Sequence, residues 1–478
     1  MSHTIEKIGG TSMSRYDAVR DNIVLGPDYA ENPYQRIFVV SAYGGITDQL
    51  LEHKKTGQPG VYGLYANADE DSAWEEALEK VTQSMNDINL ELFPESDIFD
   101  EAQSFISERI EDARVVLQNL QQLCQHGHFE IESQLLTVRE MLASLGEAHS
   151  AWSMARALRR DGVNARFIDL SGWKTDQALP LDEVIAQALS SVDVSAELPI
   201  VTGYAHCSEG LMASFDRGYS EMTFSRLAVV SKAAEAVIHK EYHLSSADPR
   251  QVGADKVVPI GRTNYDVADQ LANLGMEAIH PRAAKGLRKS GIPLRVKNTF
   301  EPEHTGTLIT SDYVSETPRV EIIAGRSHVL AIELFDQDMA GDLHSYDSAL
   351  VEIINRFRAH VVNKDINANS ITHYLDASLK AVKRIAREME KRFPSAEIDV
   401  RQVAIVSAIG SDMKMPGLLA KAVNALAEGD ISILATHQCM RQVDMQFIVD
   451  ESDYDKAVQQ LHKTLIEAHD HGYAICAA

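Results

Sequence analysis

Residues 4–12 read Thr4-Ile5-Glu6-Lys7-Ile8-Gly9-Gly10-Thr11-Ser12, a short apolar strand that runs directly into a glycine turn, and a helical pattern follows from about Ser14 to Val24. Glycines at a strand end let backbone N–H groups approach a phosphate, and Lys7 would add a compact positive charge for phosphoryl oxygens. The chain has no GxxxxGK[ST], so this is not a Walker A loop. A Gly-Gly turn after a strand is also common without any ligand, and both interpretations stay open here.

A second strand pattern, Ile37-Phe38-Val39-Val40, ends in Ser41-Ala42-Tyr43-Gly44-Gly45 and then Ile46-Thr47-Asp48. A continuous apolar run is typical of a buried parallel strand, and ligands of open α/β sheets lie beyond the carboxyl ends of such strands. Ser41 and Thr47 are therefore candidates to bind a carboxylate or a phosphate. A tight turn whose hydroxyls only cap a helix fits the same residues equally well.

The next part of the chain alternates helical and apolar patterns. Residues from about 53 to 145 are mostly helical and polar, which indicates a helical insertion into an α/β core. Further strands are expected at Ala165–Leu170, Pro199–Thr202, Ala236–His239 and Pro293–Val296. This alternation predicts a mostly parallel sheet with helices on both faces, in a domain over residues 1–315.

The tail, residues 318–478, shows two rounds of strand, helix, strand and strand, which predict a duplicated small α+β module over about 320–398 and 400–478. The first round begins with two short strands, Val320–Ala324 and Val329–Leu334, and continues with a helix and two more strands. The expected elements of both rounds are Ser345–Phe357, His360–Asn363, Ser370–Leu375, Val403–Ala408, Leu418–Leu426, Ile431–Leu434, Met445–Val449 and Tyr454–Leu465.

Composition limits the possible partners and the compartment. A net charge of −25 disfavours a nucleic-acid partner, because phosphate backbones bind to basic surfaces. No apolar run approaches the roughly 20 residues that a membrane span needs, no secretion signal opens the chain, and the four cysteines lack metal-ligand spacing, so we expect a cytoplasmic protein. Residues 69–112 hold fifteen acidic residues against two basic ones, which indicates a solvated helical face or an adaptation to high internal salt.

Two further motifs carry candidate ligand groups. Glu147 follows Gly146 on an otherwise apolar helix, where a carboxylate is usually a surface residue but would be informative if it faced the ammonium group of an amino acid. Asp216-Arg217-Gly218-Tyr219-Ser220-Glu221 precedes another helix, and the planar fork of Arg217 suits a carboxylate. A helix cap with a solvated arginine is the alternative for that motif.

Together these motifs resemble the aspartate kinases of the amino-acid kinase superfamily. Lys7–Ser12 is similar to that family's KFGGTS, Val39–Asp48 to its VVSAxxGxTD, Gly146-Glu147 to its GE pair, and Asp216–Glu221 to its GRGGSD. The later matches, which resemble ADPR, LHPR and NTFxPxxxGT, are Ala247–Arg250, Ile279–Arg282 and Asn298–Thr307. The tail resembles the family's paired ACT modules, so the resemblance covers nearly the whole chain.

The resemblance implies an enzyme that phosphorylates the side-chain carboxylate of L-aspartate with ATP and Mg²⁺, the first step towards aspartate-derived amino acids or ectoine. It implies no protein metal ligands, catalytic roles for Lys7 and Arg217, an amino-acid effector at the ACT modules, and a homodimer or higher homo-oligomer. The residues implied to hold ATP phosphates are Lys7, Gly9, Gly10 and Ser12. Those implied to hold aspartate are Thr47, Glu147, Arg217 and Ser220. Other nucleotide contacts are expected at Ser41, His239, Lys240, Ser245 and Arg250. Effector loops are expected at Gly341, Asp342, Met415 and Gly417.

Departures from the family pattern gather on the nucleotide side. His239-Lys240 replaces Thr-Asp, Ser245 replaces a tyrosine, and Glu277 replaces a phosphate-binding lysine, while Ala148 follows the GE pair in place of an arginine. Lys240 taking over the charge lost at Glu277 is one hypothesis, and two independent changes are the other. With the helical insertion, these departures resemble the ectoine-associated branch. A kinase for another acidic amino acid and a non-catalytic ACT sensor remain the alternative functions.

Overall fold

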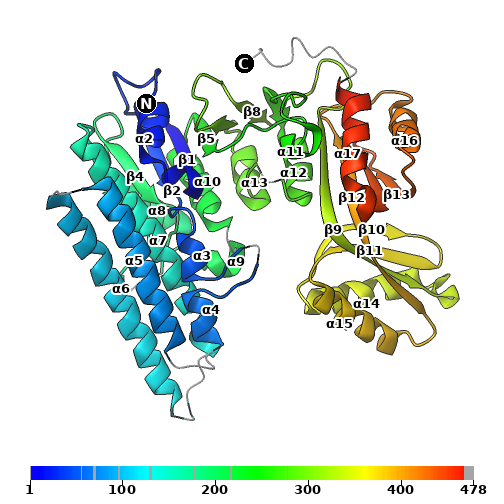
Figure 1. The fold of residues 1–478 in the computed structure, drawn as a ribbon, viewed down its shortest axis with the longest axis horizontal. Helices are drawn as coiled ribbons and strands as arrows, with labels where there is room; N and C mark the ends of the chain where they lie inside the picture. The colour runs from blue at the N-terminus through cyan, green and yellow to red at the C-terminus, as the bar shows by residue number, and fades with distance from the viewer. Residues whose placement is uncertain are drawn as a thin grey trace. The chain divides into compact units, whose positions relative to one another are not determined.

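The computed structural model describes residues 2–54, 56–67, 72–94, 97–126, 128, 132–175, 178–215, 218–276 and 278–467. The chain forms two compact units, the first from Met1–His243 and Ile279–Ser311 and the second from Leu244–Ala278 and Asp312–Ala478 (Figure 1). The second unit thus takes residues 244–278 in addition to the predicted tail. Among the described residues, no helix combines the length and the apolar composition of a membrane span.

The first unit is built on a mostly parallel sheet, as predicted. Its strands follow the order β3-β4-β2-β1-β5-β7-β8, and all of these neighbours are parallel except β7 and β8. The strands are β1 (Thr4–Ile8), β2 (Arg36–Val40), β3 (Ala165–Ile168), β4 (Leu198–Thr202), β5 (Glu235–Lys240), β7 (Leu294–Asn298) and β8 (Thr307–Thr310). β2 and β4 are buried along their whole length, which explains their continuous apolar runs.

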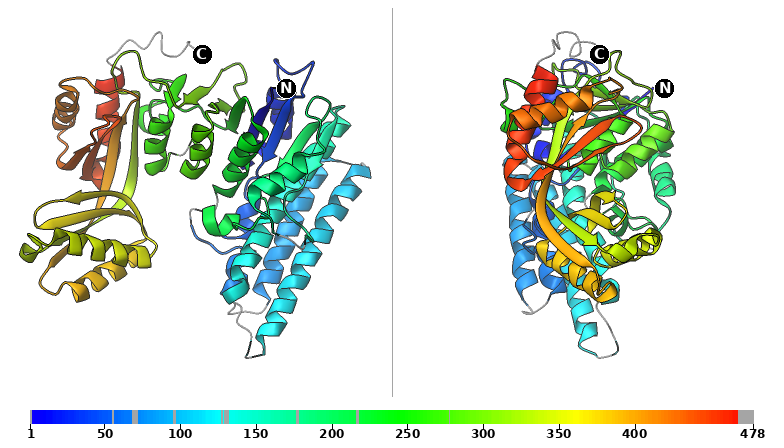
Figure 2. Two further views of the ribbon diagram at one scale, coloured as in Figure 1. Left: turned by 180° about the vertical axis from the view of Figure 1, so that it is seen from behind. Right: turned by 90° about the vertical axis from the view of Figure 1, so that its right-hand side faces the viewer.

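Helices pack on this sheet, with α7 against β2, β3 and β4 and α10 against β1, β2 and β5. The long helices α5, α6 and α7 lie side by side (Figures 1 and 2), and they include most of residues 53–145, although α7 continues to Arg160 and packs on the sheet. The helical segments of this unit are α1 (Gly10–Met13), α2 (Tyr16–Ala18), η1 (Val19–Val24), α3 (Ile46–Leu50), α4 (Val61–Ala66), α5 (Ala73–Leu92), α6 (Asp97–Cys124), α7 (Glu132–Arg160), α8 (Leu181–Leu189), α9 (Leu211–Phe215), α10 (Tyr219–Ser231) and α13 (Pro281–Lys289).

The acidic helices α5 and α6 are amphipathic. On α5, Trp74, Leu78, Val81 and Met85 recur at helical spacing and are buried. Most acidic residues of α5 and α6 lie on the exposed sides of the helices. This arrangement agrees with the interpretation of residues 69–112 as a solvated helical face.

The second unit contains one antiparallel sheet that both predicted modules share. Its strands follow the order β10-β11-β9-β12-β14-β13, and β9 pairs with β12 from Glu397↔Phe335 to Ile409↔Ile322. The strands are β9 (Ile322–Phe335), β10 (His360–Ile366), β11 (Ser370–Asp376), β12 (Glu397–Ile409), β13 (Ile433–Gln438) and β14 (Asp444–Asp450), with the short β6 (Arg262–Asn264) elsewhere in the unit. The predicted strands 320–324 and 329–334 are wrong as separate elements, because β9 continues through a bulge at which His328 has a φ of 60°.

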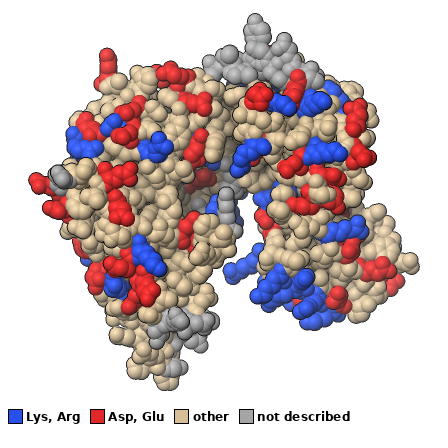
Figure 3. All heavy atoms as spheres, viewed as in Figure 1, with Lys and Arg blue, Asp and Glu red and all other residues tan. Residues whose placement is uncertain are grey.

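One hydrophobic cluster of this unit joins residues 267–274 to β9, β12 and β14, and two further clusters pack other helices against the sheet. One of these two packs α14 and α15 against one end of β9, and the other packs α16 and α17 against β12 and β14. The helical segments are α11 (Pro249–Val252), α12 (Tyr265–Asn273), η3 (Gln337–Met339), α14 (Leu343–Arg356), α15 (Leu379–Arg392), α16 (Leu418–Glu428), η4 (Glu451–Asp453), α17 (Tyr454–His462) and η5 (Lys463–Glu467). The sequence patterns above did not predict α15, whose many lysines and arginines form a basic area on this unit (Figure 3).

Candidate active site

The carboxyl ends of β1, β2, β4 and β5 meet at one edge of the first sheet, because these strands are parallel neighbours. Lys7 lies near the end of β1, Ser41 follows β2, Gly203 follows β4, and Lys240 ends β5. Open α/β sheets bind their ligands at this edge. The fold therefore brings the first two sequence motifs and the end of β5 to one place.

Close packing explains the glycine turn without reference to any ligand. A Cβ atom on Gly10 would lie 2.6 Å from the carbonyl oxygen of Ala42, so the loops after β1 and β2 touch where a side chain cannot fit. The Ser41 N–H donates to the carbonyl oxygen of Ile8 at 3.1 Å. A glycine at position 10 is therefore a structural requirement, whatever the turn binds.

The loop after β7 completes this edge. The Oγ atoms of Ser12 and Thr299 lie 3.0 Å apart in the interior, and the Thr299 N–H donates to the carbonyl oxygen of Lys240 at 2.8 Å. Thr299 thus links the glycine turn to the end of β5. It belongs to the quoted Asn298–Thr307 motif, but sequence reasoning gave it no role of its own.

Lys7 is a buried cation with a carboxylate partner. Only 8% of its surface is exposed, and its Nζ lies 3.6 Å from Oε1 of Glu221. Burial raises the pKa of Glu221, but the charges of Lys7 and Lys240 and a hydrogen bond from the His280 N–H outweigh it and leave that pKa below its usual value. Two lysines from adjacent strands therefore face one ionised carboxylate. Glu221 is the last residue of the motif Asp216–Glu221, but no sequence pattern predicted this contact with Lys7.

Glu147 lies in the interior of the protein, so its interpretation as a surface residue is wrong. It is 1% exposed on α7, and its Oε1 accepts a hydrogen bond from the Ser220 hydroxyl at 2.7 Å. Among the described residues, Oε2 has no partner with hydrogen-bond geometry. Burial raises the pKa of Glu147 to about 8, although the Ser220 hydrogen bond and the charge of Lys7 act in the opposite direction. A buried carboxyl group with a spare oxygen is suited to bind a cation.

Two glycines allow close packing around Glu147: Gly203 against its side chain, and Gly146 where α7 meets the loop after β2. A Cβ atom on Gly203 would lie 2.8 Å from Oε2 of Glu147 and 2.9 Å from the Cβ of Ser220, and one on Gly146 would lie 2.8 Å from the Cβ of Ala42. Gly203 was not among the predicted site residues, although its position directly after an apolar strand could have marked it as a candidate. Thr47, which was also predicted to bind the substrate, lies half-buried on α3, the helix that follows the loop after β2.

The side chain of His239 is paired inside the protein and is not available to bind a ligand. It is 4% exposed, and its Nε2 lies 2.7 Å from Oε2 of Glu6, which also forms an ion pair with the buried Arg36. Burial lowers the pKa of His239, although the hydrogen bond and the charge of Glu6 act in the opposite direction. Only the backbone of His239 is left for the predicted nucleotide contact, which stays a prediction.

The contacts of the remaining predicted residues with this site stay predictions. Ser245 and Arg250 belong to the second unit, where the Ser245 hydroxyl donates to the Ala247 carbonyl and Arg250 pairs with Asp248 at 2.7 Å. Arg217 and Glu277 lie outside the described residues, and so does the proposed pairing of Glu277 with Lys240. Among the described parts of the chain, no group of three His, Cys, Asp or Glu residues is placed to hold a metal ion.

Comparisons with known proteins agree with this geometry. A model of the amino acid kinase family matches residues 3–298, and a model of an ACT domain matches residues 406–465. The chain is 58% identical to aspartate kinase Ask_Ect from Stutzerimonas stutzeri (strain A1501) over 100% of both chains. It is 24% identical to aspartokinase 1, chloroplastic, from Arabidopsis thaliana over 98% of this chain and 80% of that protein.

The fold is similar to that of E. coli aspartokinase III in complex with aspartate and ADP, with a TM-score of 0.72, 20% identity, and coverage of 97% of this chain and 100% of the other. Aspartate kinase from Clostridium acetobutylicum gives a TM-score of 0.70 at 21% identity, with coverage of 97% and 100%. The motifs, the parallel sheet with its convergent strand ends and the full-length relative lead to one conclusion: this chain belongs to the aspartate kinases, within the amino acid kinase family.

Proposed function

We propose that the protein transfers the γ-phosphoryl group of ATP to the side-chain carboxylate of L-aspartate, forming 4-phospho-L-aspartate. The observation that carries the proposal is the convergence of the buried Lys7 with the buried Glu147 at one sheet edge. Lys7 would neutralise phosphoryl oxygens during transfer, and the spare oxygen of Glu147 would bind the substrate's ammonium group.

For this reaction the protein needs mainly to position the two substrates and to neutralise the charge on the transferring group. The aspartate side chain is already ionised at pH 7, because its ordinary pKa is about 3.9, and it can attack in line without a strong general base. Mg²⁺ would neutralise phosphate oxygens, and we propose that ATP itself supplies its main ligands.

The other proposed contacts follow from the family motifs. Arg217 would pair with a carboxylate of aspartate, and Thr47 and Ser220 would complete the acceptor site. The proposed nucleotide contacts are Gly9, Gly10, Ser12, Ser41, His239 through its backbone, Lys240, Ser245 and Arg250. Because the donor is ATP, we propose a cytoplasmic enzyme, and the similarity to Ask_Ect favours the ectoine-associated type.

One assay separates this function from its alternatives. ADP release is measured by enzymatic coupling with aspartate, with glutamate and with neither amino acid. We expect release that depends on aspartate. Release with glutamate alone would identify a kinase for another acidic amino acid. No amino-acid-dependent release, together with ligand binding to the second unit, would identify a sensor.

Glu147→Gln is expected to raise the KM for aspartate at least about tenfold, equivalent to roughly 1.4 kcal/mol, because it removes the charge that pairs with the ammonium group. With a pKa of about 8, the wild-type carboxyl ionises as the pH rises, so aspartate binding should tighten between pH 6.5 and 8.5. This pH dependence should vanish in the variant, while the KM for ATP stays constant. If Glu147→Gln showed the same pH dependence of the KM for aspartate as the wild type, Glu147 would not be the group that binds the ammonium.

The same substitution should stabilise the protein at alkaline pH. Because folding raises the pKa of Glu147 from 4.5 to about 8, the folded state binds more protons than the unfolded state between these values, and stability falls as the pH rises through this range. Glu147→Gln should therefore unfold at a higher temperature than wild type at pH 8.5 and show a smaller difference at pH 5. Calorimetric scans at both pH values measure this.

We further propose that the second unit binds a small amino acid and pairs with a second copy through its sheet. Gly341 and Gly417 both adopt positive φ, 95° and 83°, one residue before Asp342 at the start of α14 and directly before α16. Each module thus has a strand-to-helix loop with a positive-φ glycine, and Asp342 and Met415 lie in these loops. Calorimetry with lysine, threonine, methionine and ectoine tests the loops. No binding of any of them at millimolar concentration would remove the regulatory proposal.

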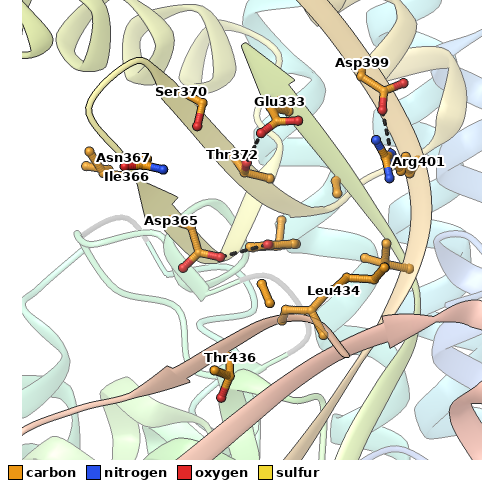
Figure 4. Close-up of a pocket in the computed structure, with 15 residues that line it drawn as sticks. Glu333, Asp365, Ile366, Asn367, Ser370, Thr372, Asp399, Arg401, Leu434 and Thr436 are labelled. Carbon is orange, nitrogen blue, oxygen red and sulfur yellow. Dashed lines mark hydrogen bonds and ion pairs between the residues drawn. The ribbon is translucent and has the colours of Figure 1, made fainter. Parts of the chain in front are cut away.

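The pairing proposal rests on a hollow of about 450 Å³ in the sheet face, bordered by Glu333, Thr372, Leu434 and Thr436 (Figure 4). The apolar side chains of Leu434 and Ile366 are 47% and 46% exposed there. Leu434→Lys is expected to shift the protein towards monomer in analytical ultracentrifugation. Val351→Lys, at a similarly exposed position on α14, should not. Equal behaviour of both variants would contradict pairing through this face.

A further inference from the structure

Glu140 is a carboxylate on α7 that accepts three hydrogen bonds from residues 204–213, which form the loop after β4 and the start of α9. Its Oε2 accepts from the Tyr204 hydroxyl at 2.7 Å, and its Oε1 accepts from the N–H groups of Met212 and Ala213 at 2.8 and 3.1 Å. The two N–H groups lie at the start of α9, where a helix leaves its first donors without partners. A side chain from α7 therefore caps α9 and holds Tyr204 at the same time.

The segment that Glu140 holds connects Gly203 and Ser220, the two residues that lie against Glu147 in the candidate acceptor site. Tyr204 directly follows Gly203, which lies against Oε2 of Glu147, and the chain beyond α9 leads to Ser220, which donates to Oε1 of Glu147. Glu140 is seven residues before Glu147 on α7, so both carboxyl groups project from the same side of this helix. Glu140 thus lies behind the acceptor site and faces the loop that shapes it.

Tyr204 connects the carboxylate to the site through further contacts. It is 2% exposed, its ring meets the ring of Tyr219 edge-on at 5.8 Å, and Tyr219 immediately precedes Ser220. The Thr202 hydroxyl donates to the Tyr204 carbonyl at 2.8 Å. Burial and the nearby charge of Glu140 raise the pKa of Tyr204, so its hydroxyl stays protonated and remains a donor. The backbone, ring and hydroxyl of Tyr204 are all fixed.

We propose that Glu140 is a positioning residue for the acceptor amino acid: by holding Tyr204 and the start of α9, it keeps Gly203 and Ser220 in place around Glu147. The inference deepens the proposed function and rests on it, because the site that Glu140 braces is the one assigned to aspartate. The three hydrogen bonds of Glu140 come from Tyr204, Met212 and Ala213, so its effect should be confined to the acceptor.

Glu140→Gln and Tyr204→Phe test the proposal in the full-length enzyme. Glutamine keeps the size but removes the charge that strengthens all three bonds, and phenylalanine removes only the hydroxyl. We expect Glu140→Gln to raise the KM for aspartate about tenfold and Tyr204→Phe about threefold, with the KM for ATP changed less than twofold. The double variant should be less impaired than the product of the two single effects, because both act on one bond.

Glu209→Gln is the matched control. Glu209 belongs to the same loop and also caps a helix, because its carboxylate accepts from the Leu181 N–H at the start of α8 at 3.1 Å. In the described structure its carboxylate bonds to neither Tyr204 nor α9. Its backbone carbonyl accepts from the Ser214 hydroxyl of α9 at 3.0 Å, and Glu209→Gln leaves that backbone bond in place, so both KM values should stay unchanged. Equal rises in the KM for aspartate and for ATP, unchanged KM values in both test variants, or an equal effect of Glu209→Gln would overturn the proposal. A wild-type enzyme without aspartate-dependent turnover would instead overturn the proposed function.

Discussion

Replacing Lys7 with alanine is expected to lower kcat by roughly a hundredfold or more, the loss that follows removal of one preorganised donor to a developing oxyanion. Lys7 is 8% exposed at the end of β1, so its charge acts where little water can screen it. Its partner Glu221 keeps the hydrogen bond from His280 and the nearby charge of Lys240. The variant should therefore stay folded.

The measurement is steady-state kcat with saturating ATP and aspartate, alongside circular dichroism. Lys285→Ala is the control, because this lysine is exposed on α13 in the same unit, and it should keep wild-type kcat. If circular dichroism is unchanged and kcat of the Lys7 variant falls less than about tenfold, worth roughly 1.4 kcal/mol, Lys7 does not stabilise the transferring group.

Arg36→Met is expected to cost about 3–5 kcal/mol of stability, the range for removing one partner of a buried ion pair. Arg36 and Glu6 are both 2% exposed, with Nε and Oε1 2.6 Å apart, and the guanidinium also donates to the carbonyl oxygens of Ile23 and Val24. The variant leaves Glu6 buried without its cation. Unfolding would also displace Lys7, which is next to Glu6 on β1, so the activity should fall in proportion to the folded fraction.

Chemical denaturation compares Arg36→Met with Arg36→Met/Glu6→Gln. The double variant should recover part of the loss, because it no longer buries an unpaired charge. Burial opposes ionisation of Glu6, but the charge of Arg36 and the hydrogen bond from His239 outweigh it and lower the pKa of Glu6. The pair therefore stabilises the wild type above pH 4.5, and this contribution is lost as the pH falls further. A single variant as stable as wild type at pH 7 would refute the role of the pair.

The sequence predicted the parallel sheet because β2 and β4 are buried along their whole length and appear as continuous apolar runs, as Ile37–Val40 does. It misjudged Glu147 for a related reason. Residues 142–150 of α7 are all buried, including the polar Ser144 and His149, so a carboxylate beside the apolar positions of this helix is not exposed. Burial of such a segment depends on packing by distant elements, which local periodicity does not reveal.

Three other misses have equally specific causes. Polar residues at the bulge of β9 interrupt its pattern, so one strand appeared as two. Alternation along β5 decides that His239 faces Glu6, and position at a strand end alone could not show this. The links that join Glu140 to Tyr204 and Thr299 to Ser12 span 64 and 287 positions, and no local pattern marks them.

Trapping of the product tests the central claim most directly. An acyl phosphate formed on aspartate reacts with hydroxylamine to give the side-chain hydroxamate, which mass spectrometry distinguishes from unreacted aspartate. With wild-type enzyme, ATP, Mg²⁺ and aspartate, we expect the hydroxamate to form in step with ADP, and to fall at least about a hundredfold with Lys7→Ala. ADP release without any aspartyl hydroxamate would contradict the claim that this protein phosphorylates the aspartate side chain.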